Sequence, residues 1–458
     1  MKKYDAVIIG FGKGGKTLAG KLAGEGKRVA LIEKSDRMYG GTCINVGCIP
    51  SKSLVRSSGM TAARGDISFE EKAALYRAGI EEKRRVTSML RKKNFDKLNN
   101  LEQVTIYNGT ASFLSNTEVS VAPADGSDPF VIEGEKIFIN TGSASFVPPI
   151  DGLKESPRVY LSDSLMELDV LPEKLVIIGG GYIGLEFCSM YSGFGSEVTV
   201  IQNEARLVPR EDEDMAAEIQ KTLEEKGVRF VIGAAITGIR DEENHSYVQY
   251  VLDEKEGELE ADAILVATGR RPNIAGLHLE AAGVEVTSRG AVAVDENYRT
   301  TAPNIWAMGD VTGGLQFTYV SLDDFRIVWS SLHDGGYRAD SVKRSHIPYS
   351  VFIEPSFSRV GMNEQEARKA GIDVKIAKLP AAAIPKAQVL NKTKGLLKAV
   401  IDANTNQILG AMLFCEESYE MINIIKLAMD MGADYTVLRD QIYTHPTMSE
   451  AFNDLFAI

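Results

Sequence analysis

Ala6-Val7-Ile8-Ile9-Gly10-Phe11-Gly12-Lys13-Gly14-Gly15 joins a short apolar run to a glycine-rich turn near the start of the chain. The apolar run predicts a buried parallel strand, and residues 16–24 predict the helix that follows it. A second expected strand, 28–32, ends at an acidic residue 23 positions after the first glycine. Glycines at this spacing allow a tight turn and let a pyrophosphate approach the helix N-terminus, while the acid binds ribose hydroxyls. The stretch therefore predicts a dinucleotide site formed by Gly10, Gly12, Gly15 and Glu33.

The same unit recurs 169 residues later, with expected strands at 175–178 and 197–201. Its turn carries Gly179, Gly181 and Gly184, but Gln202 replaces the acid at the ribose position. Glutamine neither repels nor attracts the 2′-phosphate of NADPH strongly, so NADH and NADPH both stay open, with a slight preference for NADH. Two dinucleotide units in one chain predict two dinucleotides, a nicotinamide nucleotide and a flavin that accepts its hydride.

Two cysteines lie five positions apart in Gly40-Gly41-Thr42-Cys43-Ile44-Asn45-Val46-Gly47-Cys48-Ile49-Pro50-Ser51-Lys52. A thiol near a helix N-terminus or a cation is shifted toward the reactive thiolate. A helix is expected to start near Cys43, and Gly47 with Pro50 offers the distortion that lets the two sulfurs meet. We interpret the pair as a redox-active dithiol, with structural cysteines or half a metal site as alternatives. The remaining cysteines, Cys188 and Cys415, are expected to be inert core thiols.

Length and composition limit the possible classes of protein. The 458 residues predict two to three domains, and the formal net charge of −12 argues against nonspecific binding to nucleic acid or anionic membranes. No apolar run reaches the roughly 18 residues of a transmembrane helix, and the chain enters its first strand without room for a signal peptide. We therefore expect a cytoplasmic protein, where a reversible disulfide would be catalytic or sensing.

Other segments complete the expected architecture. Strands ending at Thr141-Gly142 and at Gly309-Asp310 present these residues at the edge where open α/β sheets bind ligands, so Asp310 is expected to accept from a flavin side-chain hydroxyl. Residues 69–101 are expected to form a surface pair of helices whose basic runs, 83–85 and 91–93, face solvent. From about residue 345, alternating apolar strands and an apolar helix predict a third, α+β domain.

One of the five histidines has informative neighbours. His445 precedes Pro446, and Glu450 is placed to hydrogen-bond one ring nitrogen, which leaves the other as an oriented base. A structural histidine is the alternative. The pair matters for chemistry only if His445 meets Cys43 or Cys48 in space, which could occur across a dimer interface.

Together these motifs resemble the flavin-dependent pyridine nucleotide-disulfide oxidoreductases, the family of glutathione reductase, dihydrolipoamide dehydrogenase and mercuric reductase. The resemblance spans essentially the whole chain. Besides the two glycine units and residues 40–52, it rests on Ala-Thr-Gly-Arg-Arg-Pro-Asn (267–273), Met-Gly-Asp (308–310) and His-Pro-Thr-Met-Ser-Glu (445–450). It implies a homodimer with an α/β fold of two Rossmann-like domains and an α+β domain. The implied domains are FAD-binding (1–145 and 270–343), NAD(P)H-binding (146–269) and dimerisation (344–458).

The resemblance also implies residue roles. Cys48 would lie against the flavin, Cys43 would face the substrate, and Lys52, paired with Glu186, would sit near the flavin. Tyr182 would gate the nicotinamide pocket. His445 with Glu450, from the other subunit, would be the acid/base. The remaining implied cofactor-binding residues are Gly41, Thr42, Thr141, Gly142, Asp310 and Gly269, and no resident metal is expected.

Within the family, several positions favour one group. The glutathione-binding arginine of glutathione reductases falls at Gly20, and the extra metal-binding parts of mercuric reductases are absent. Residues 313–324 depart from dihydrolipoamide dehydrogenases and resemble the RclA group of bacterial flavoproteins, as do 10–13, 383–387 and 438–442. That resemblance implies reduction of hypothiocyanous acid in bacterial defence against host oxidants. Cu(II) reduction, dihydrolipoamide dehydrogenase activity and a redox-sensing flavoprotein subunit stay open as alternatives.

Overall fold

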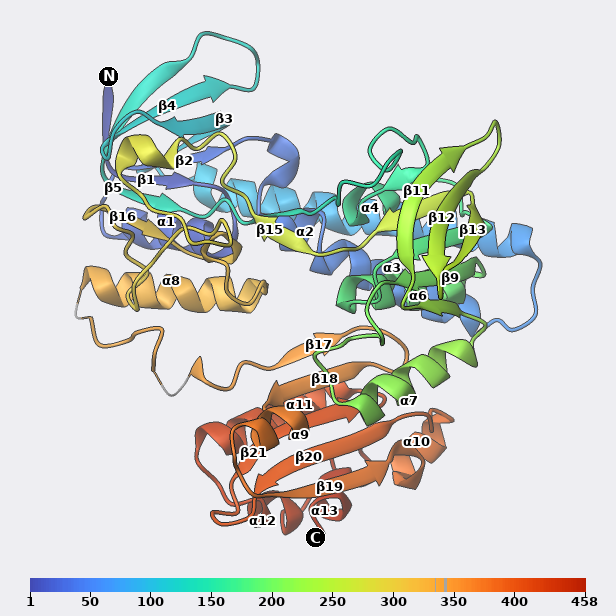
Figure 1. Cartoon of the computed structure of the whole chain (residues 1–458). Coiled ribbons are helices and arrows are strands. Elements are labelled where there is room, and N and C mark those ends of the chain that lie inside the picture. Colours follow the sequence, from blue (N-terminus) through green and yellow to red (C-terminus); the bar gives the residue numbers. More distant parts are fainter. Residues whose placement is uncertain (334, 342–343) are drawn as a thin grey trace. The chain divides into compact units, whose positions relative to one another are not determined.

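The computed structural model describes residues 1–333, 335–341 and 344–458 (Figure 1). They form two compact units. Unit 1 comprises Met1–Ser53, Ile80–Phe146 and Gly269–Ser341, and unit 2 comprises Leu54–Gly79, Val147–Thr268 and Val342–Ile458. Within the described ranges, no helix is long and apolar enough to cross a membrane.

Unit 1 contains the first dinucleotide unit of the sequence, built on a six-stranded sheet. Its first strand pairs in parallel with two neighbours, and buried apolar side chains fill its second half, as expected for a strand covered on both faces. Two helices that contact each other lie beside the sheet (Figure 1). The strands are β1 (Lys2–Ile9), β2 (Val29–Glu33), β3 (Val104–Phe113), β4 (Glu118–Pro123), β5 (Phe130–Ile139) and β16 (Ile305–Ala307), and the helices are α1 (Lys13–Gly24) and α8 (Thr318–Leu332).

Unit 2 contains the second dinucleotide unit, a five-stranded parallel sheet with the order β10-β9-β8-β14-β7. The predicted recurrence of the first unit is confirmed, because strand, glycine turn, helix and strand follow in the same order. The elements are β7 (Val159–Tyr160), α5 (Ser162–Leu165), β8 (Lys174–Ile178), α6 (Tyr182–Phe194), β9 (Glu197–Gln202), α7 (Glu213–Glu224), β10 (Arg229–Ile232) and β14 (Ala263–Val266), with a three-stranded antiparallel sheet of β11 (Ala235–Asp241), β12 (Ser246–Leu252) and β13 (Lys255–Ala261).

The C-terminal part of unit 2 is a five-stranded antiparallel sheet with the order β17-β18-β21-β20-β19. Its apolar core includes the face of α11, so the predicted α+β character is confirmed. The elements are β17 (Tyr349–Val351), β18 (Phe357–Gly361), α9 (Glu364–Lys369), β19 (Val374–Pro380), α10 (Pro385–Leu390), β20 (Leu396–Asp402), β21 (Ile408–Phe414), α11 (Ser418–Asp430), α12 (Thr436–Arg439) and α13 (Ala451–Leu455).

The two connections between the dinucleotide units pair with each other. β6 (Ser143–Ser145) and β15 (Arg270–Pro272) form a short antiparallel ladder in unit 1. The mixed α/β fold expected from the sequence is therefore confirmed, while the exact domain boundaries stay a prediction. The boundary at 343/344 falls beside residues outside the described ranges.

The segment 69–101 corrects the sequence prediction. It is one 31-residue helix, α4 (Phe69–Asn99), and not a pair of helices. Gly79, its one potential breaker, lies against another helical residue: an added Cβ would be 3.0 Å from the Ser57 Cβ. The glycine therefore allows this close packing. A glycine within a helix costs only about 1 kcal/mol relative to alanine, so the helix continues through it. The predicted solvent exposure of 83–85 is wrong for Lys83, which is 1% exposed.

Candidate active site

The two cysteines of unit 1 lie in the first turns of two consecutive helices. α2 (Thr42–Asn45) carries Cys43, and α3 (Cys48–Ala62) begins with Cys48. The helical path breaks at Val46, whose φ of −140° is outside the helical region. This break at 46–47 is the predicted distortion, and it brings the two thiols within hydrogen-bond contact.

Buried contacts hold the turn that carries the cysteines. The Asn45 amide donates to the Tyr39 and Gly41 carbonyls at 3.0 and 2.9 Å, and its oxygen accepts from Arg91 Nε at 2.7 Å. Arg91 thus supports this turn. The sequence predicts only that residues 91–93 face solvent. Gly41 has φ +82°, and an added Cβ would be 2.8 Å from the Gly12 Cα. The cysteine turn therefore packs directly on the first glycine turn.

The environment of Cys43 favours its thiolate. The two cysteines are not joined in a disulfide, and Cys43 is half-buried and Cys48 exposed. The hydrogen bond from the Cys48 thiol is the largest influence that lowers the pKa of Cys43, burial opposes it, and the Thr318 hydroxyl and the charges of Lys16 and Lys52 lower it further. The resulting pKa is about 6. This environment thus favours the thiolate of Cys43 at neutral pH, and the thiolate is the reactive form, so the role of Cys43 as the nucleophile stays a prediction.

This pKa gives a pH prediction. Because the folded-state pKa lies below the ordinary value near 9, the Cys43 thiolate is present above about pH 6 and is lost as the pH falls through that value. The rate of Cys43 alkylation by iodoacetamide in the chemically reduced protein is therefore expected to reach half its plateau near pH 6. Peptide-resolved mass spectrometry measures the rate, and the buried Cys188 in the same sample is the unreactive control. A midpoint at about pH 8.5 or above, in the range of an ordinary cysteine thiol, would contradict the prediction.

The first glycine turn is tied to the ends of three neighbouring strands. Glu33 Oε2, at the end of β2, accepts from the Phe11 N–H at 3.0 Å. Asn140, just after β5, accepts from the Gly15 N–H at 2.9 Å and donates to the Met308 carbonyl at 2.7 Å. Burial raises the pKa of Glu33, which is consistent with a carboxylate enclosed at the ligand-binding edge. Gly10 and Gly12 form the turn, and α1 begins at Lys13, with the Gly14 N–H of its first turn donating to the Ser321 hydroxyl at 3.2 Å.

Asp310 lies at the same edge, after β16. Its Oδ2 accepts from the Ser143 hydroxyl at 2.7 Å, and Ser143 also accepts from Arg270 Nε at 2.9 Å. Burial raises the Asp310 pKa. Next to this group, the Thr141 hydroxyl donates to the Asn273 carbonyl at 2.7 Å. Two enclosed carboxylates at one edge, with a helix N-terminus between them, fit the ribose, pyrophosphate and polyol groups of a flavin dinucleotide.

The second glycine turn, in unit 2, repeats this arrangement. Gln202 Oε1 accepts from the Gly180 N–H at 2.9 Å, the position that Glu33 occupies toward Phe11. Gly181 has an ordinary φ of −82°, and an added Cβ would meet nothing within 4 Å. Neither backbone conformation nor packing within the chain requires glycine at 181, so the open space suits a dinucleotide phosphate. By contrast, Gly184 is required by packing, because its Cβ would lie 1.9 Å from the Gly179 carbonyl oxygen.

Tyr182, at the start of α6, is anchored to a buried carboxylate. Its hydroxyl donates to Glu211 Oε1 at 2.5 Å, and the Tyr349 hydroxyl donates to the same oxygen at 2.5 Å. Glu211 Oε2 pairs with Arg359 at 3.2 Å, and the two side chains are 0% and 6% exposed. Arg359 also pairs with Glu366. The expected gate residue is thus fixed by groups of the C-terminal sheet within the same unit.

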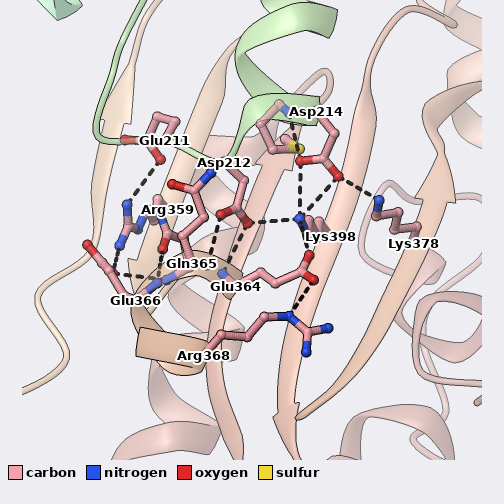
Figure 2. A network of polar contacts seen from close by, with 12 residues as sticks. Glu211, Asp212, Asp214, Arg359, Glu364, Gln365, Glu366, Arg368, Lys378 and Lys398 are labelled. Atoms are coloured by element: carbon pink, nitrogen blue, oxygen red, sulfur yellow. Dashed lines mark hydrogen bonds and ion pairs between the residues drawn. The ribbon is translucent and has the colours of Figure 1, made fainter. Parts of the chain in front are cut away.

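Figure 2 shows that the acids following Glu211 join the same network. Lys398, on β20 and 2% exposed, contacts Asp212 at 2.8 Å, Glu364 at 2.8 Å and Asp214 at 3.1 Å. Lys378 contacts Asp214 at 2.6 Å. The loop before α7 is therefore held on the antiparallel sheet by buried or half-buried ion pairs.

The expected histidine–carboxylate contact is present. His445 Nδ1 lies 2.8 Å from Glu450 Oε2, and the imidazole is 71% exposed. The second carboxylate oxygen, Glu450 Oε1, is buried and has no hydrogen-bond partner among the described residues. The contact holds the Nδ1 side of the imidazole, and Nε2 is the ring nitrogen that can take part in a proton transfer.

Other predicted site residues divide between the two units. Lys52, in unit 1, donates to the Ser51 hydroxyl at 3.4 Å, and Glu186, in unit 2, accepts from the Phe352 N–H at 2.8 Å. Their pairing stays a prediction, as does an approach of His445 to the cysteines. Cys188 and Cys415 are buried, and burial raises both pKa values, which confirms them as unreactive core thiols.

Sequence reasoning missed two groups of site residues. Lys16 and Thr318 act on Cys43, and Glu211, Tyr349 and Arg359 hold Tyr182. A signal for Lys16 was present, because a cation in the first turn of a helix opposes the helix dipole and requires a reason. The Glu211 group has no local signal, since Glu211 lies 138 and 148 positions from Tyr349 and Arg359 and only the tertiary fold shows their burial.

Comparison with known proteins gives the class. The chain matches the pyridine nucleotide-disulphide oxidoreductase family over residues 4–324 and the dimerisation domain of the same family over residues 347–456. It therefore belongs to the pyridine nucleotide-disulphide oxidoreductases, as the motifs predicted. The expected cofactors, FAD and NAD(P)H, are those of this family, and the dimerisation domain supports a homodimer.

Individual relatives narrow the group. The chain is 49% identical to RclA of Escherichia coli strain K12, a probable pyridine nucleotide-disulfide oxidoreductase, over 458 residues and 100% of both chains. The solved Cu(II) complex of the HOCl-induced flavoprotein disulfide reductase RclA from Escherichia coli has a TM-score of 0.93 at 49% identity and covers 100% of this chain and 99% of that one. Mercuric reductase of Bacillus cereus is 33% identical and covers 98% of this chain and 70% of its own. The likenesses place the chain among flavoprotein disulfide reductases of the RclA type.

Proposed function

We propose that the protein uses NAD(P)H to reduce a small electrophilic oxidant, hypothiocyanous acid, in bacterial defence against host oxidants. The observation that carries this proposal is the Cys43–Cys48 pair, in which a thiol with a pKa of about 6 is hydrogen-bonded to a second thiol. The HOCl-induced RclA of Escherichia coli, 48% identical in its solved structure, supports a role toward such oxidants.

The chemistry of the pair balances for this oxidant. The Cys43 thiolate attacks the sulfur of hypothiocyanous acid, a sulfur–sulfur bond forms, and the sulfur–oxygen bond breaks as hydroxide leaves and takes up a proton. The Cys48 thiol then loses its proton to solvent, its sulfur attacks the Cys43 sulfur, and thiocyanate leaves as the disulfide forms. When bound, FAD supplies the transfer of two electrons from NAD(P)H to this disulfide, which takes up two protons and returns both thiols.

His445 provides the proton in this proposal. Glu450 holds Nδ1, so Nε2 is the atom from which a proton moves to the leaving hydroxide. Because the imidazole is exposed and the chain carries the family's dimerisation domain, we assign His445 to the active site of the second subunit of a homodimer. Lys52, paired with Glu186, is proposed to stabilise negative charge near the flavin.

Cofactor binding is assigned by the geometry of the two edges. We assign FAD to the edge of unit 1 that holds Glu33 and Asp310, and NAD(P)H to the edge of unit 2 that holds Gly181 and Gln202. Tyr182 is proposed as the gate of the nicotinamide pocket. Further proposed cofactor contacts are Gly10, Gly12, Gly15, Gly41, Thr42, Thr141, Gly142, Gly179, Gly184 and Gly269. A cytoplasmic location is proposed with the function.

A panel of oxidants tests the proposal. We expect NADH or NADPH oxidation by the holoenzyme to give the highest kcat/KM with hypothiocyanous acid, compared with Cu(II), glutathione disulfide, lipoamide and Hg(II). The two nucleotides measured side by side settle the preference that Gln202 leaves open. Fast turnover of dihydrolipoamide with NAD would support the alternative dehydrogenase, and slow turnover with every oxidant would favour a redox sensor.

Cu(II) reduction is the second candidate. It is favoured by one specific observation, the Cu(II) complexes of Escherichia coli RclA and of its cysteine-to-serine variant, both with a TM-score of 0.93 to this chain. The described residues contain no group of three or more His, Cys, Asp or Glu arranged to hold a resident metal ion. In this candidate, copper is taken as a substrate, and Cu(I) formation followed with a Cu(I)-specific chelator distinguishes it from hypothiocyanous acid reduction.

A further inference from the structure

Lys16 is a cation in an unfavourable place. It lies in the first turn of α1, where the helix dipole disfavours positive charge. The side chain is half-buried, and no carboxylate among the described residues forms an ion pair with it. Its Nζ donates to two neutral acceptors, the Asn94 amide oxygen at 2.6 Å and the Gly40 carbonyl at 3.2 Å. The described part of the chain thus offers this ammonium two neutral acceptors and no carboxylate partner.

The two acceptors direct the ammonium toward the cysteine turn. Gly40 lies immediately before the turn that carries Cys43, and Asn94, on α4, packs on Gly40: an added Cβ there would be 3.4 Å from the Asn94 side-chain carbon. The charges of Lys16 and Cys43 interact, each favouring the ionised form of the other. An ammonium has three donors, and the two acceptors leave one for a further partner.

We propose that the Lys16 ammonium is the counter-charge of the Cys43 thiolate and, given the proposed function on which this inference rests, the group that receives the small anion released when Cys48 attacks Cys43. The ligand class is a small monovalent anion such as thiocyanate. Lys16 is thus a positioning and specificity residue, which favours oxidants whose reduction releases an anion.

The surrounding charges agree with this assignment. Cys43 faces Cys48 and Lys52 on α3, Thr318 on α8, and Lys16 on α1. Lys16 in turn faces Lys13 on its own helix and Lys97 on α4. Burial, Lys13 and Lys97 lower the pKa of Lys16 to about 8, whereas Cys43 raises it. The charges around the sulfur are therefore cationic, and Lys16 still carries its proton at neutral pH while Cys43 is a thiolate.

Alkylation with two reagents of nearly equal shape tests the counter-charge. Iodoacetamide is neutral and iodoacetate is an anion, and both react with the Cys43 thiolate of the chemically reduced holoenzyme without any oxidant. In Lys16→Met, the midpoint of the iodoacetamide pH profile is expected to rise by about one pH unit. The ratio of iodoacetate to iodoacetamide rates at fixed thiolate fraction is expected to fall by about threefold or more, because the attraction for the anionic reagent is lost.

Matched variants separate charge from structure. Lys21→Met removes the same charge from the exposed side of α1, beside Trp329, and is expected to leave both readouts unchanged. Lys16→Arg keeps the charge and is expected to keep the wild-type profile. Lys16→Gln replaces Lys16→Met if the methionine variant does not retain FAD. A wild-type profile and reagent ratio in the neutral Lys16 variants would overturn the counter-charge, as would an equal loss in Lys16→Arg.

Sodium thiocyanate probes the anion directly. Compared with sodium chloride at equal ionic strength, it is expected to slow iodoacetate alkylation of the wild type and to lose this effect in Lys16→Met. An equal effect of the two salts in the wild type would overturn the anion-receiving role.

These readouts do not depend on turnover, so failure of hypothiocyanous acid reduction would remove the proposed function while the alkylation results still decide the role of Lys16. A loss of FAD affinity in Lys16→Met with an unchanged Cys43 profile would instead assign the charge to the cofactor and overturn the inference.

Discussion

Cys43→Ser is expected to lower oxidant-dependent NAD(P)H turnover by about a thousandfold or more, because it removes the attacking sulfur. The serine hydroxyl is not ionised at neutral pH, so it offers Cys48 a neutral acceptor in place of the negatively charged Cys43 thiolate. The fold should remain, since the turn is held by Asn45, Arg91 and the close contact of Gly41 with Gly12, none of which involves the thiol. Steady-state kinetics with hypothiocyanous acid measures the loss, and anaerobic bleaching of the flavin by NADH shows that the first half of the reaction survives.

Cys48→Ser is the matched control for the order of the two cysteines. Here Cys43 can still attack, but no second thiol releases it, so the protein is expected to accumulate one thiocyanate group on Cys43 and to stop. Intact mass and peptide mapping locate the group. Accumulation of the adduct on Cys48 in Cys43→Ser, with full reactivity of that sulfur, would reverse the assigned roles. The same experiment does not depend on the identity of the electron donor.

The sequence was sufficient for the parts of the fold that follow local rules. The two strand–glycine–helix units, the break between Cys43 and Cys48 and the His445–Glu450 contact each arise within about twenty residues, where periodicity and turn chemistry are readable. Residues 69–101 form one helix and not the predicted pair, although a glycine within a helix ordinarily weakens it. At Gly79 the packing against Ser57 decides, and that contact is visible only in three dimensions.

The rest of the site depends on long-range contacts. Lys83 carries a charge that normally faces water, yet tertiary packing buries it. From the sequence, Gln202 is interpreted only as the absence of an acid at the ribose position. In the structure its amide oxygen accepts the same hydrogen bond from the glycine turn as Glu33 does in the first unit. The pKa of Cys43 combines groups from three helices, so no local pattern could give its value. The sequence therefore predicts which residues react, and the fold shows which groups from distant parts of the chain surround them.

Arg359→Met is expected to destabilise unit 2 by about 3–5 kcal/mol, because it leaves the carboxylate of Glu211 fully buried without its cation. The Tyr182 and Tyr349 hydroxyls would still donate to that carboxylate, but neutral donors do not replace a charge. For a unit of this size the thermal midpoint should fall by about 10 °C. Calorimetry of the holoprotein at fixed concentration measures the shift.

The double variant Arg359→Met/Glu211→Gln separates the buried charge from the lost packing. Removing both charges should restore most of the midpoint, because a neutral amide in place of Glu211 no longer needs the guanidinium. The Lys398 ion pairs, which belong to the same polar network in Figure 2, involve neither Arg359 nor Glu211 and are expected to stay intact in both variants. If the double variant is no more stable than the single one, the loss comes from the missing contacts of Arg359 with the Arg210 and Gly361 carbonyls, and Glu211 is not the residue that depends on it. If the thermal midpoint is restored, the Glu211–Arg359 ion pair is what supports Tyr182, the residue expected at the nicotinamide pocket. The pair then links this tyrosine to the sheet of the dimerisation domain.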